Sequence, residues 1–506
     1  MVFNAPELRY SRTVGINFQP SKGVLPGEES GRDGGDHRGI FGTGPMSGGP
    51  PPAEASMSTR GTVTAVVART VAITLLLLVG LGFARTAGAN GFSLPVQDSL
   101  QVGRAKAGTV AAASDASTVF HNPAGMTELE GEQMLAGATA IYAGYDVSNR
   151  SSTATTPGTG GAPVALVGEN GHPRTFEVVP TLFYARPMTP SRDFWVGIAL
   201  TSPWGLGVQY DDDWFGRYDS IETRLTTVNL SPAMAYRITD WLSVGGGFNI
   251  EYADAKLTNA LPDTLAPGGP SPATDGVAKL TGDGFEVGFN IGVLVKPWPR
   301  TRIGLHYRSA IQHELSGKLK VSNLPPALAA GNGRVGADFS VDVPDVVAIG
   351  IAHEAVQGTT LFAEAQWFNW SRFDELRATY ADGRPDTVRE QDWKDTWSFY
   401  GAIEQRLLER WILRAGAGYE PTPTVDEFRN TSLPDGDRIR VGLGLSYEWS
   451  ERLRVDLAYA HVFSSRESID LTPSFFEGTP AAGSVNVRGR ADLFVNDIAL
   501  RVRYLF

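Results

Sequence analysis

From about residue 135 onward, one pattern recurs: apolar and polar side chains alternate over about ten or more residues before a turn. Because successive side chains of a strand point to opposite faces, this alternation gives a sheet one apolar and one polar face. In the segment from Arg438 to Trp449, for example, Ile439 and Leu443 share one face and Arg440 lies on the other. The pattern predicts an all-β protein.

About fourteen segments carry this pattern. They lie near residues 134–147, 175–187, 194–209, 224–237, 241–256, 284–297, 301–315, 337–355, 359–371, 394–406, 410–419, 437–449, 452–463 and 493–506. Short turns such as Ser450-Glu451 alternate with long loops near residues 148–174, 210–223, 257–283, 316–336, 372–393, 420–436 and 464–492. A soluble sandwich would also alternate, but it has no reason to segregate loop lengths in this way.

Short turns on one rim and long loops on the other are typical of outer-membrane barrels. Tryptophans beside the short turns, as in an aromatic girdle, agree with this; they are Trp241, Trp298, Trp411 and Trp449. We therefore predict a transmembrane antiparallel β-barrel of about fourteen strands in the bacterial outer membrane.

Residues 90–133 lack this alternation and are rich in small residues and turn formers. They predict a hatch, or plug, of short helices. Glycines on the polar faces of the strands clear space for such a hatch; they are Gly245, Gly247, Gly304, Gly416, Gly442 and Gly444. The barrel itself is then expected to span residues 134–506.

Residues 57–89 have the three parts of a secretory signal peptide: positive Arg60 and Arg69, an apolar run at 71–83, and Ala87-Gly88-Ala89 as a cleavage site. The run is too short to cross a bilayer as a helix. Residues 1–56 are rich in Gly and Pro and show no periodicity, so they are either an over-extended start before Met57 or a disordered tail.

Several classes of function are excluded or disfavoured. The net charge of -11 argues against nucleic acid as a partner, and the absence of cysteine excludes thiolate chemistry. No Gly-x-Ser-x-Gly or His-Glu-x-x-His motif is present. We therefore predict no catalytic residues, no metal site and no cofactor, and we interpret the acidic run at residues 211–213 as solvated loop.

A set of short motifs resembles the long-chain fatty acid transporter (FadL) family of outer-membrane proteins, which also contains aromatic-hydrocarbon transporters. The motifs are Gly91-Phe92, Val102-Gly103-Arg104-Ala105, Ser114-Asp115-Ala116-Ser117, Asn122-Pro123-Ala124-Gly125, Ser202-Pro203-Trp204-Gly205-Leu206, Gly216-Arg217-Tyr218, Val228-Asn229-Leu230-Ser231-Pro232-Ala233, and Gln366-Trp367 with Trp370-Ser371. The resemblance covers residues 90–506 and implies a fourteen-stranded barrel with an N-terminal hatch.

An oily solute needs a dry path, because burying each methylene is worth about 0.8 kcal/mol. We expect capture at apolar positions of two long loops, Leu261, Leu265, Leu324 and Leu328, which resemble the family's entry groove; loop packing is the alternative. Inward arginines are candidates for binding a carboxylate head, or are partners of lumenal acids such as Glu251 and Asp497. These arginines are Arg308, Arg440, Arg414 and Arg501.

Pro203 lacks a donor for the strand ladder and predicts a kink or bulge. By resemblance, this kink opens the wall near Asn122-Pro123-Ala124, and Phe92 moves with the N-terminus; Gly205 belongs to the same gate. The sequence equally allows a barrel irregularity without a gating role, and exit straight through the hatch.

These features predict passive uptake of hydrophobic molecules, in the first place long-chain fatty acids. The alternatives are an aromatic-hydrocarbon or alkane transporter of the same fold, a general porin, and an outer-membrane lipase-type enzyme. Outer-membrane lipid and lipopolysaccharide are expected partners of a monomer.

Overall fold

The computed structural model describes residues 91–506, which belong to one compact unit. The expected signal peptide at residues 57–89 and the extension at residues 1–56 lie outside the described residues.

In the described chain, four short helices precede the first strand and three lie between strands. The helices are α2 (Ser99–Gly103), α3 (Thr109–Ala112), α4 (Thr118–His121), η1 (Pro123–Glu128), η2 (Pro157–Thr159), η3 (Pro326–Gly331) and η4 (Trp370–Arg372). None of the helices within residues 91–506 is long and apolar enough to cross a bilayer.

The strands are β1 (Gln133–Asn149), β2 (Thr153–Thr155), β3 (Pro163–Ala165), β4 (Arg174–Pro187), β5 (Phe194–Thr201), β6 (Gly205–Gln209), β7 (Glu222–Thr239), β8 (Leu242–Leu261), β9 (Gly276–Trp298), β10 (Thr301–Arg308), β11 (Ile311–Ser322), β12 (Gly333–Val343), β13 (Val346–Val356), β14 (Thr359–Phe368), β15 (Glu375–Tyr380), β16 (Thr387–Glu390), β17 (Thr396–Leu407), β18 (Trp411–Glu420), β19 (Arg438–Glu448), β20 (Leu453–Ser464), β21 (Glu467–Leu471), β22 (Ser474–Phe475) and β23 (Gly483–Leu505).

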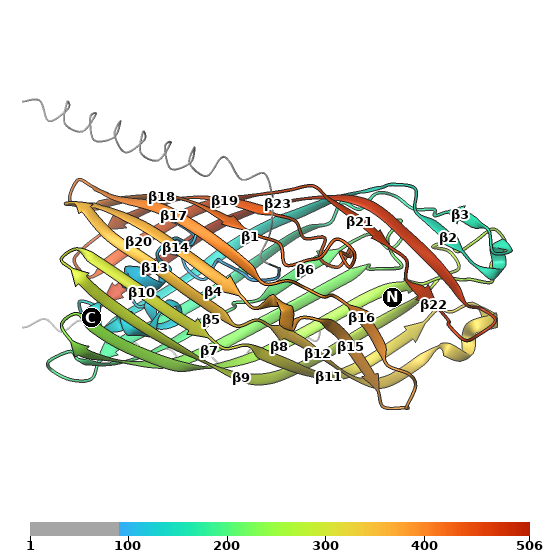
Figure 1. Cartoon of the computed structure of the whole chain (residues 1–506), viewed down its shortest axis with the longest axis horizontal. Coiled ribbons are helices and arrows are strands. Elements are labelled where there is room, and N and C mark those ends of the chain that lie inside the picture. Colours follow the sequence, from blue (N-terminus) through green and yellow to red (C-terminus); the bar gives the residue numbers. More distant parts are fainter. Residues whose placement is uncertain (1–90) are drawn as a thin grey trace, which may run out of the picture. The chain divides into compact units, whose positions relative to one another are not determined.

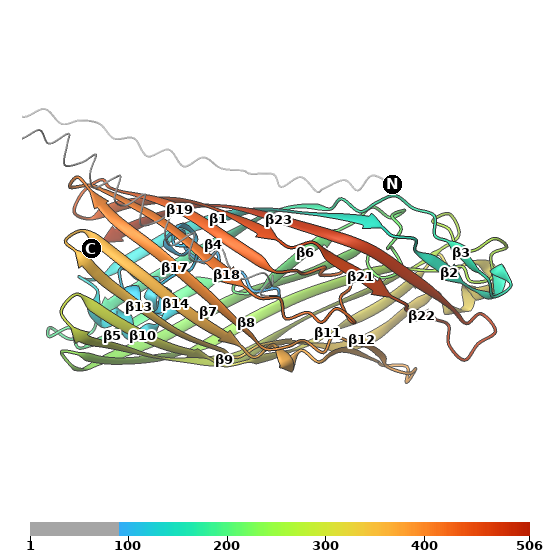
Figure 2. The ribbon, with the colours of Figure 1, turned by 45° about the horizontal axis from the view of Figure 1, so that its top comes forward.

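These strands close into one antiparallel barrel (Figure 1). The last long strand, β23, pairs with β1 and completes the ring. Some neighbouring strands are consecutive pieces of one crossing, such as β5 with β6, which both pair with β7. Counted by crossings, the barrel has 14 strands, so the predicted fold is confirmed. Figure 2 shows that the strands run obliquely to the long axis.

Several strands extend further into the long loops than the sequence predicts. β8 ends at Leu261 and β9 begins at Gly276, so both continue into the loop predicted at 257–283. β23 begins at Gly483, inside the loop predicted at 464–492. The limits were predicted from apolar alternation, but ladder hydrogen bonds continue where water bathes both faces of the sheet and alternation is lost.

The outer surface of the barrel is apolar. Large side chains such as Phe248, Phe285 and Ile498 are exposed on the strands, and the four tryptophans beside the short turns are exposed as well. Contiguous exposed apolar surface of this kind suits lipid and not water. The predicted outward face is therefore the lipid face.

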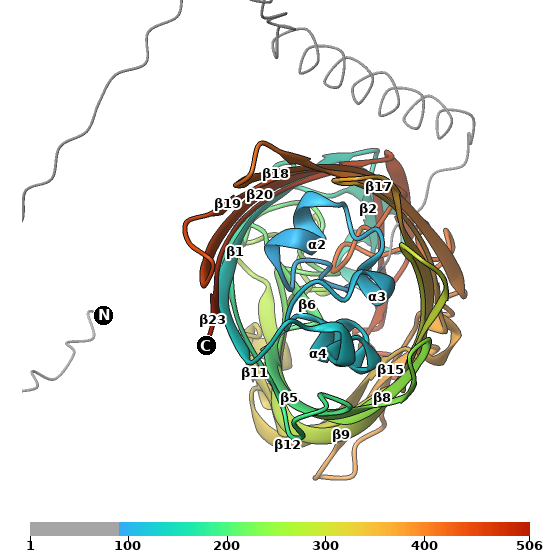
Figure 3. The same cartoon turned by 90° about the vertical axis from the view of Figure 1, so that its left-hand side faces the viewer.

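The helices of residues 99–128 lie inside the ring of strands (Figure 3). Five of the six glycines singled out above face the hatch backbone: a Cβ at Gly304 would lie 1.9 Å from the carbonyl oxygen of Val110. The other four are Gly245, Gly416, Gly442 and Gly444. Gly247 is the exception, because its missing Cβ faces Pro232 on the neighbouring strand. Glycine thus lets the hatch approach the wall backbone to backbone.

Candidate functional site

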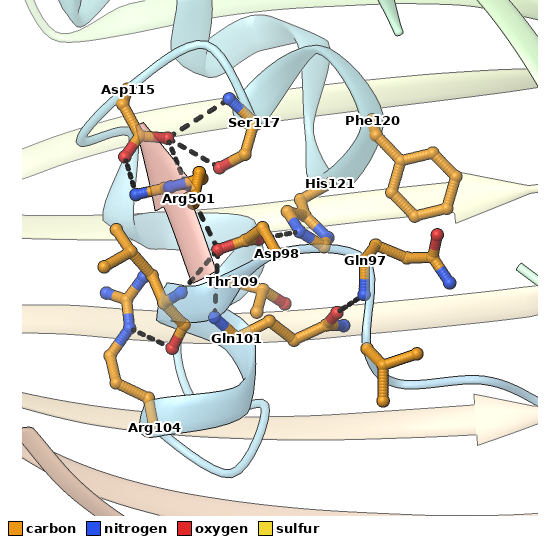
Figure 4. Close-up of polar contacts among 12 residues, drawn as sticks. Gln97, Asp98, Gln101, Arg104, Thr109, Asp115, Ser117, Phe120, His121 and Arg501 are labelled. Carbon is orange, nitrogen blue, oxygen red and sulfur yellow. Dashed lines mark hydrogen bonds and ion pairs between the residues drawn. The ribbon is translucent and has the colours of Figure 1, made fainter. Parts of the chain in front are cut away.

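A buried charge cluster joins the hatch to the barrel (Figure 4). The guanidinium of Arg501 on β23 lies 2.9 Å from Asp115 and 3.3 Å from Asp98, which are both hatch residues. It also binds Asp456 on β20 at 2.8 Å, and Arg454 of that strand binds Asp115 at 2.8 Å. These ion pairs fasten the hatch to two adjacent strands.

The same carboxylates organise the hatch itself. Asp98 caps α2 by accepting the backbone N–H of Leu100 at 2.7 Å, and it binds His121 Nε2 at 2.7 Å. Asp115 accepts hydrogen bonds from Ser117. Burial alone would raise the pKa of Asp115, but the two neighbouring guanidinium groups outweigh burial and hold this pKa well below its usual range. The cluster therefore stays ionised.

Asn122-Pro123-Ala124 packs against the inner face of β8 and β9. The Asn122 side chain donates to the carbonyl of Val110 at 2.7 Å and to that of Val293 at 3.0 Å, and it accepts the N–H of Ala124 at 3.2 Å. A Cβ at Gly292 would lie 1.9 Å from the Asn122 Oδ1 atom. The triplet thus docks the hatch on β8 and β9, and among the described residues no hydrogen bond links it to the kink. Its part in a gate stays a prediction.

The predicted kink is present between β5 and β6, at Ser202-Pro203-Trp204. The first residues of the hatch segment supply its hydrogen-bond partners. The N–H of Leu94 donates to the Pro203 carbonyl at 2.9 Å, and the N–H of Gly205 donates to the Phe92 carbonyl at 3.0 Å. At the kink, backbone groups of the wall thus form hydrogen bonds with the N-terminal segment instead of with a neighbouring strand.

The kink leaves a gap in the wall between β4 and β6. The β4–β5 ladder ends at the pair Leu182 and Leu200, and β6 pairs only with β7. Beyond that pair, the Thr175 hydroxyl donates to the Gly207 carbonyl at 2.7 Å and bridges the far end of the gap.

A cavity of about 270 Å³ fills this gap. Its lining includes Val178 and Val228, which are exposed on the lipid face, and Arg440 and Asp497, which are buried in the lumen. Leu94 of the hatch segment lines it as well, and a Cβ at Gly205 would lie 2.7 Å from the Leu94 Cδ1 atom. The cavity thus leads from the lipid face to the N-terminal segment.

Phe92 lies in a cage of aromatic rings. Its ring centre is 4.9 Å from Trp370, 5.6 Å from Trp393, 5.8 Å from Phe373 and 6.2 Å from Trp204. Three of these contacts are edge-to-face, the arrangement that aromatic quadrupoles favour. Apolar burial therefore anchors the N-terminal segment.

The cage belongs to a larger apolar cluster on the inner side of the barrel. Its buried members are Phe92, Trp204, Leu225, Ala253, Ala255, Ile311, Leu315, Phe339, Val341, Val343, Phe368, Trp370, Phe373, Ala378, Trp393 and Leu433. Half-buried Leu257 and Leu280 pack against it on the side of the long loops. This part of the lumen is therefore apolar.

The four leucines predicted for capture do not form one group. Leu324 is buried over Gly276, at 2.6 Å from the position of its missing Cβ, and Gly276 pairs with Leu261 in the β8–β9 ladder. Leu265 is exposed beside η2, and Leu328 is half-buried on η3. Leu261 and Leu324 are thus both neighbours of Gly276.

The four candidate arginines are all buried, and each has polar partners. Arg440 and Arg414 bind Asp497 and Glu404, each at 2.6 Å, and Arg501 is the centre of the charge cluster. Arg308 donates to a neighbouring asparagine at 2.6 Å and to the carbonyl oxygen of residue 120 at 2.9 Å. These contacts favour the structural role that the sequence left open.

The sequence does not point to the partners of Phe92. Phe373 and Trp393 both fall within the segment predicted as loop 372–393, where no periodicity relates them to the N-terminus. The one available signal is that aromatic residues stand near the ends of a segment that is mostly polar.

Fold and site together define a class: an outer-membrane barrel whose lumen is filled by its own hatch and whose wall has a gap. Residues 80–506 match the family described as outer membrane protein transport protein (OMPP1/FadL/TodX), and the chain belongs to this family. This confirms both the resemblance and the outer-membrane location.

Relatives and solved structures agree. A long-chain fatty acid transport protein of Escherichia coli is 28% identical over 390 residues, which cover 71% of this chain and 84% of that protein. A Pseudomonas aeruginosa FadL homologue has a TM-score of 0.71 at 23% identity, with 82% of this chain and 99% of that chain covered. The Pseudomonas putida toluene transporter TodX has a TM-score of 0.61 at 17% identity, with 82% and 100% covered. The two structures share the fold.

Proposed function

We propose that this protein takes up hydrophobic molecules, in the first place long-chain fatty acids, by passive diffusion across the outer membrane. The observation that carries the proposal is the gap between β4 and β6, which joins the lipid face to the N-terminal segment of a barrel filled by its hatch. A long acyl chain prefers apolar surroundings by roughly ten kcal/mol. The name of the Escherichia coli relative supports the substrate class.

The path we propose has three parts. A molecule is captured near Leu261 and Leu324, passes along the apolar cluster, and leaves sideways through the gap when Phe92 and Leu94 shift. Each part is apolar, so no step requires full hydration of the chain. The hatch helices remain in place, since ion pairs hold them to β20 and β23.

An aromatic hydrocarbon is the second candidate substrate. The rings around Phe92 suit a flat apolar solute, and the TodX structure, titled a toluene transporter, has the same fold. Uptake of a radiolabelled fatty acid is measured with and without an excess of toluene to distinguish the two substrates. If toluene is the preferred substrate, it reduces uptake of the fatty acid; if the fatty acid is preferred, its uptake is unchanged.

We further infer that the protein is a monomer without enzymatic activity that contacts membrane lipid and lipopolysaccharide. An ester-hydrolysis assay on the purified protein tests the second point, since a lipase-type enzyme would release product. Mass measurement in detergent tests the first.

Replacing Pro203 by valine is expected to reduce fatty acid uptake by about tenfold, because a β-branched residue with an N–H favours a regular strand that closes the gap. The measurement is the rate of uptake into liposomes that contain the purified variant. Pro232→Val is the matched control, since Pro232 lies on β7 within its ladder with β5. Equal uptake by Pro203→Val and the unaltered protein would remove the kink from the proposal.

A further inference from the structure

Lys106 is a buried cation that forms no hydrogen bond or ion pair with its ammonium among the described residues. It lies in the turn between α2 and α3, and 6% of the residue is exposed. Its ammonium lies 5.1 Å from the ring centre of Phe368 and 5.5 Å from that of Tyr400. Among residues 91–506, no hydrogen-bond acceptor or ion-pair carboxylate binds this ammonium. This sets Lys106 apart from the four arginines discussed above.

Lys106 lines a cavity of about 70 Å³ under the kink. His306 lines the same cavity, is buried, and has an Nε2 atom without a hydrogen-bond partner among the described residues. Arg308 and His121 also face it, but their partners are Asn249 and Asp98. The cavity therefore holds a free cation and a free imidazole nitrogen.

The cavity borders the apolar cluster. Trp204 and Phe368 belong to both, and half-buried Val346 lines the cavity and packs against the cluster. A volume of about 70 Å³ admits a small head group but not a chain. The site therefore places two polar groups, Lys106 and His306, at the edge of the apolar cluster.

We propose that Lys106 binds the carboxylate of a fatty acid whose chain lies in the apolar cluster, with His306 as a second donor. This inference rests on the proposed function and names its substrate class: acids are preferred to neutral hydrocarbons. A carboxylate gives the buried ammonium the partner it lacks, whereas toluene or an alkane leaves it unpaired.

The charges around Lys106 agree with this role. Burial lowers the pKa of Lys106 to about 8, although Glu420 and Glu364 act in the opposite direction. The side chain is therefore charged at neutral pH. Glu364 is itself held by Thr109 at 2.8 Å and by Gln366, so it is not free to move to the ammonium.

The test compares oleic acid with oleyl alcohol, which has the same chain and no carboxylate. Binding to the purified full chain in non-ionic detergent is followed by quenching of intrinsic tryptophan fluorescence, since Trp204 lines the cavity. We expect the unaltered protein to bind the acid about tenfold or more tightly than the alcohol. Lys106→Met should remove this preference by weakening the acid alone, and Lys106→Arg should keep it.

Lys296→Met is the matched control, because Lys296 also lies between barrel and hatch but is paired with Glu128 at 2.8 Å. It should bind both ligands as the unaltered protein does. If the Lys106→Met variant does not fold, Lys106→Gln serves, since it keeps a long polar side chain without the charge. Undiminished binding of the acid by the uncharged variant overturns this inference alone. Failure of the unaltered protein to bind either ligand overturns the proposed function as well.

Discussion

Replacing Arg501 by methionine is expected to lower the free energy of unfolding by about 3–5 kcal/mol, because one cation would be removed from a buried cluster of carboxylates. Asp98, Asp115 and Asp456 all lie within 3.3 Å of its guanidinium, and all are buried. Among the described residues, Arg454 would be the one guanidinium still in ion-pair distance of Asp115 and Asp456. The measurement is urea unfolding of the protein in lipid vesicles, followed by tryptophan fluorescence.

Arg406→Met is the control for this experiment. Arg406 binds Glu448 at 2.7 Å at the rim of the barrel, where the arginine side chain is 45% exposed. An exposed pair of this kind contributes about 0–1 kcal/mol. Similar losses of stability in the two variants would contradict the role of the charge cluster in fastening the hatch.

Replacing Gly304 by leucine is expected to displace the hatch from the wall. The new Cβ would lie 1.9 Å from the Val110 carbonyl oxygen, and a backbone atom cannot turn away as a side chain can. A cost of about 3 kcal/mol corresponds to about a hundredfold faster opening. Amide hydrogen exchange of residues 99–128 should accelerate by that factor, and small polar solutes should enter vesicles that contain the variant.

Gly401→Leu is the matched control. Gly401 is also a strand glycine, but the nearest atom to its missing Cβ is 4.0 Å away. This variant should keep the hatch protected and the vesicles tight. Unchanged exchange in Gly304→Leu would mean that close approach of hatch and wall is not needed to seat the hatch.

The features that could be predicted from the sequence are local ones. Alternation identifies the lipid face, because a period of two places Ile439 and Leu443 on one side whatever the rest of the chain does. Glycines on the inner face indicate where the hatch approaches the wall closely, and this too can be read from the alternation. Gly304 and Gly442 are such positions. Pro203 breaks a ladder because of its own covalent structure.

The features that could not be predicted depend on contacts between distant parts of the chain. Nothing near Phe92 in the sequence indicates that Trp370 and Trp393 will surround it. Whether a buried cation is paired is also a property of the fold. Arg440 and Lys106 are both cations directed to the lumen, and only the structure shows that Arg440 has Asp497 and that Lys106 has no such partner.

The hatch therefore has two parts that are attached in different ways. Ion pairs and glycine contacts fix residues 99–128 to the wall. The segment of residues 91–97 is held by aromatic packing around Phe92, by two backbone hydrogen bonds to the kink, and by the Gln97 side chain, which bonds Ser202. Further hydrogen bonds join Gly91 to Asp435 and Arg438, and Val96 to Thr139. At about 1 kcal/mol each, these hydrogen bonds are together worth several kcal/mol. Residues 91–97 carry no charged side chain, so the segment can move without breaking the ion pairs that hold the helices.

A disulfide between this segment and the kink tests the central claim most directly. Ser93 lies opposite Trp204 in an antiparallel bridge, a geometry that suits a disulfide, and the natural chain has no cysteine. In the double variant Ser93→Cys with Trp204→Cys, fatty acid uptake into liposomes should be at least about tenfold slower when oxidised than when reduced, because the segment must leave the kink for the molecule to pass. Equal uptake in the two redox states would contradict sideways passage through the gap.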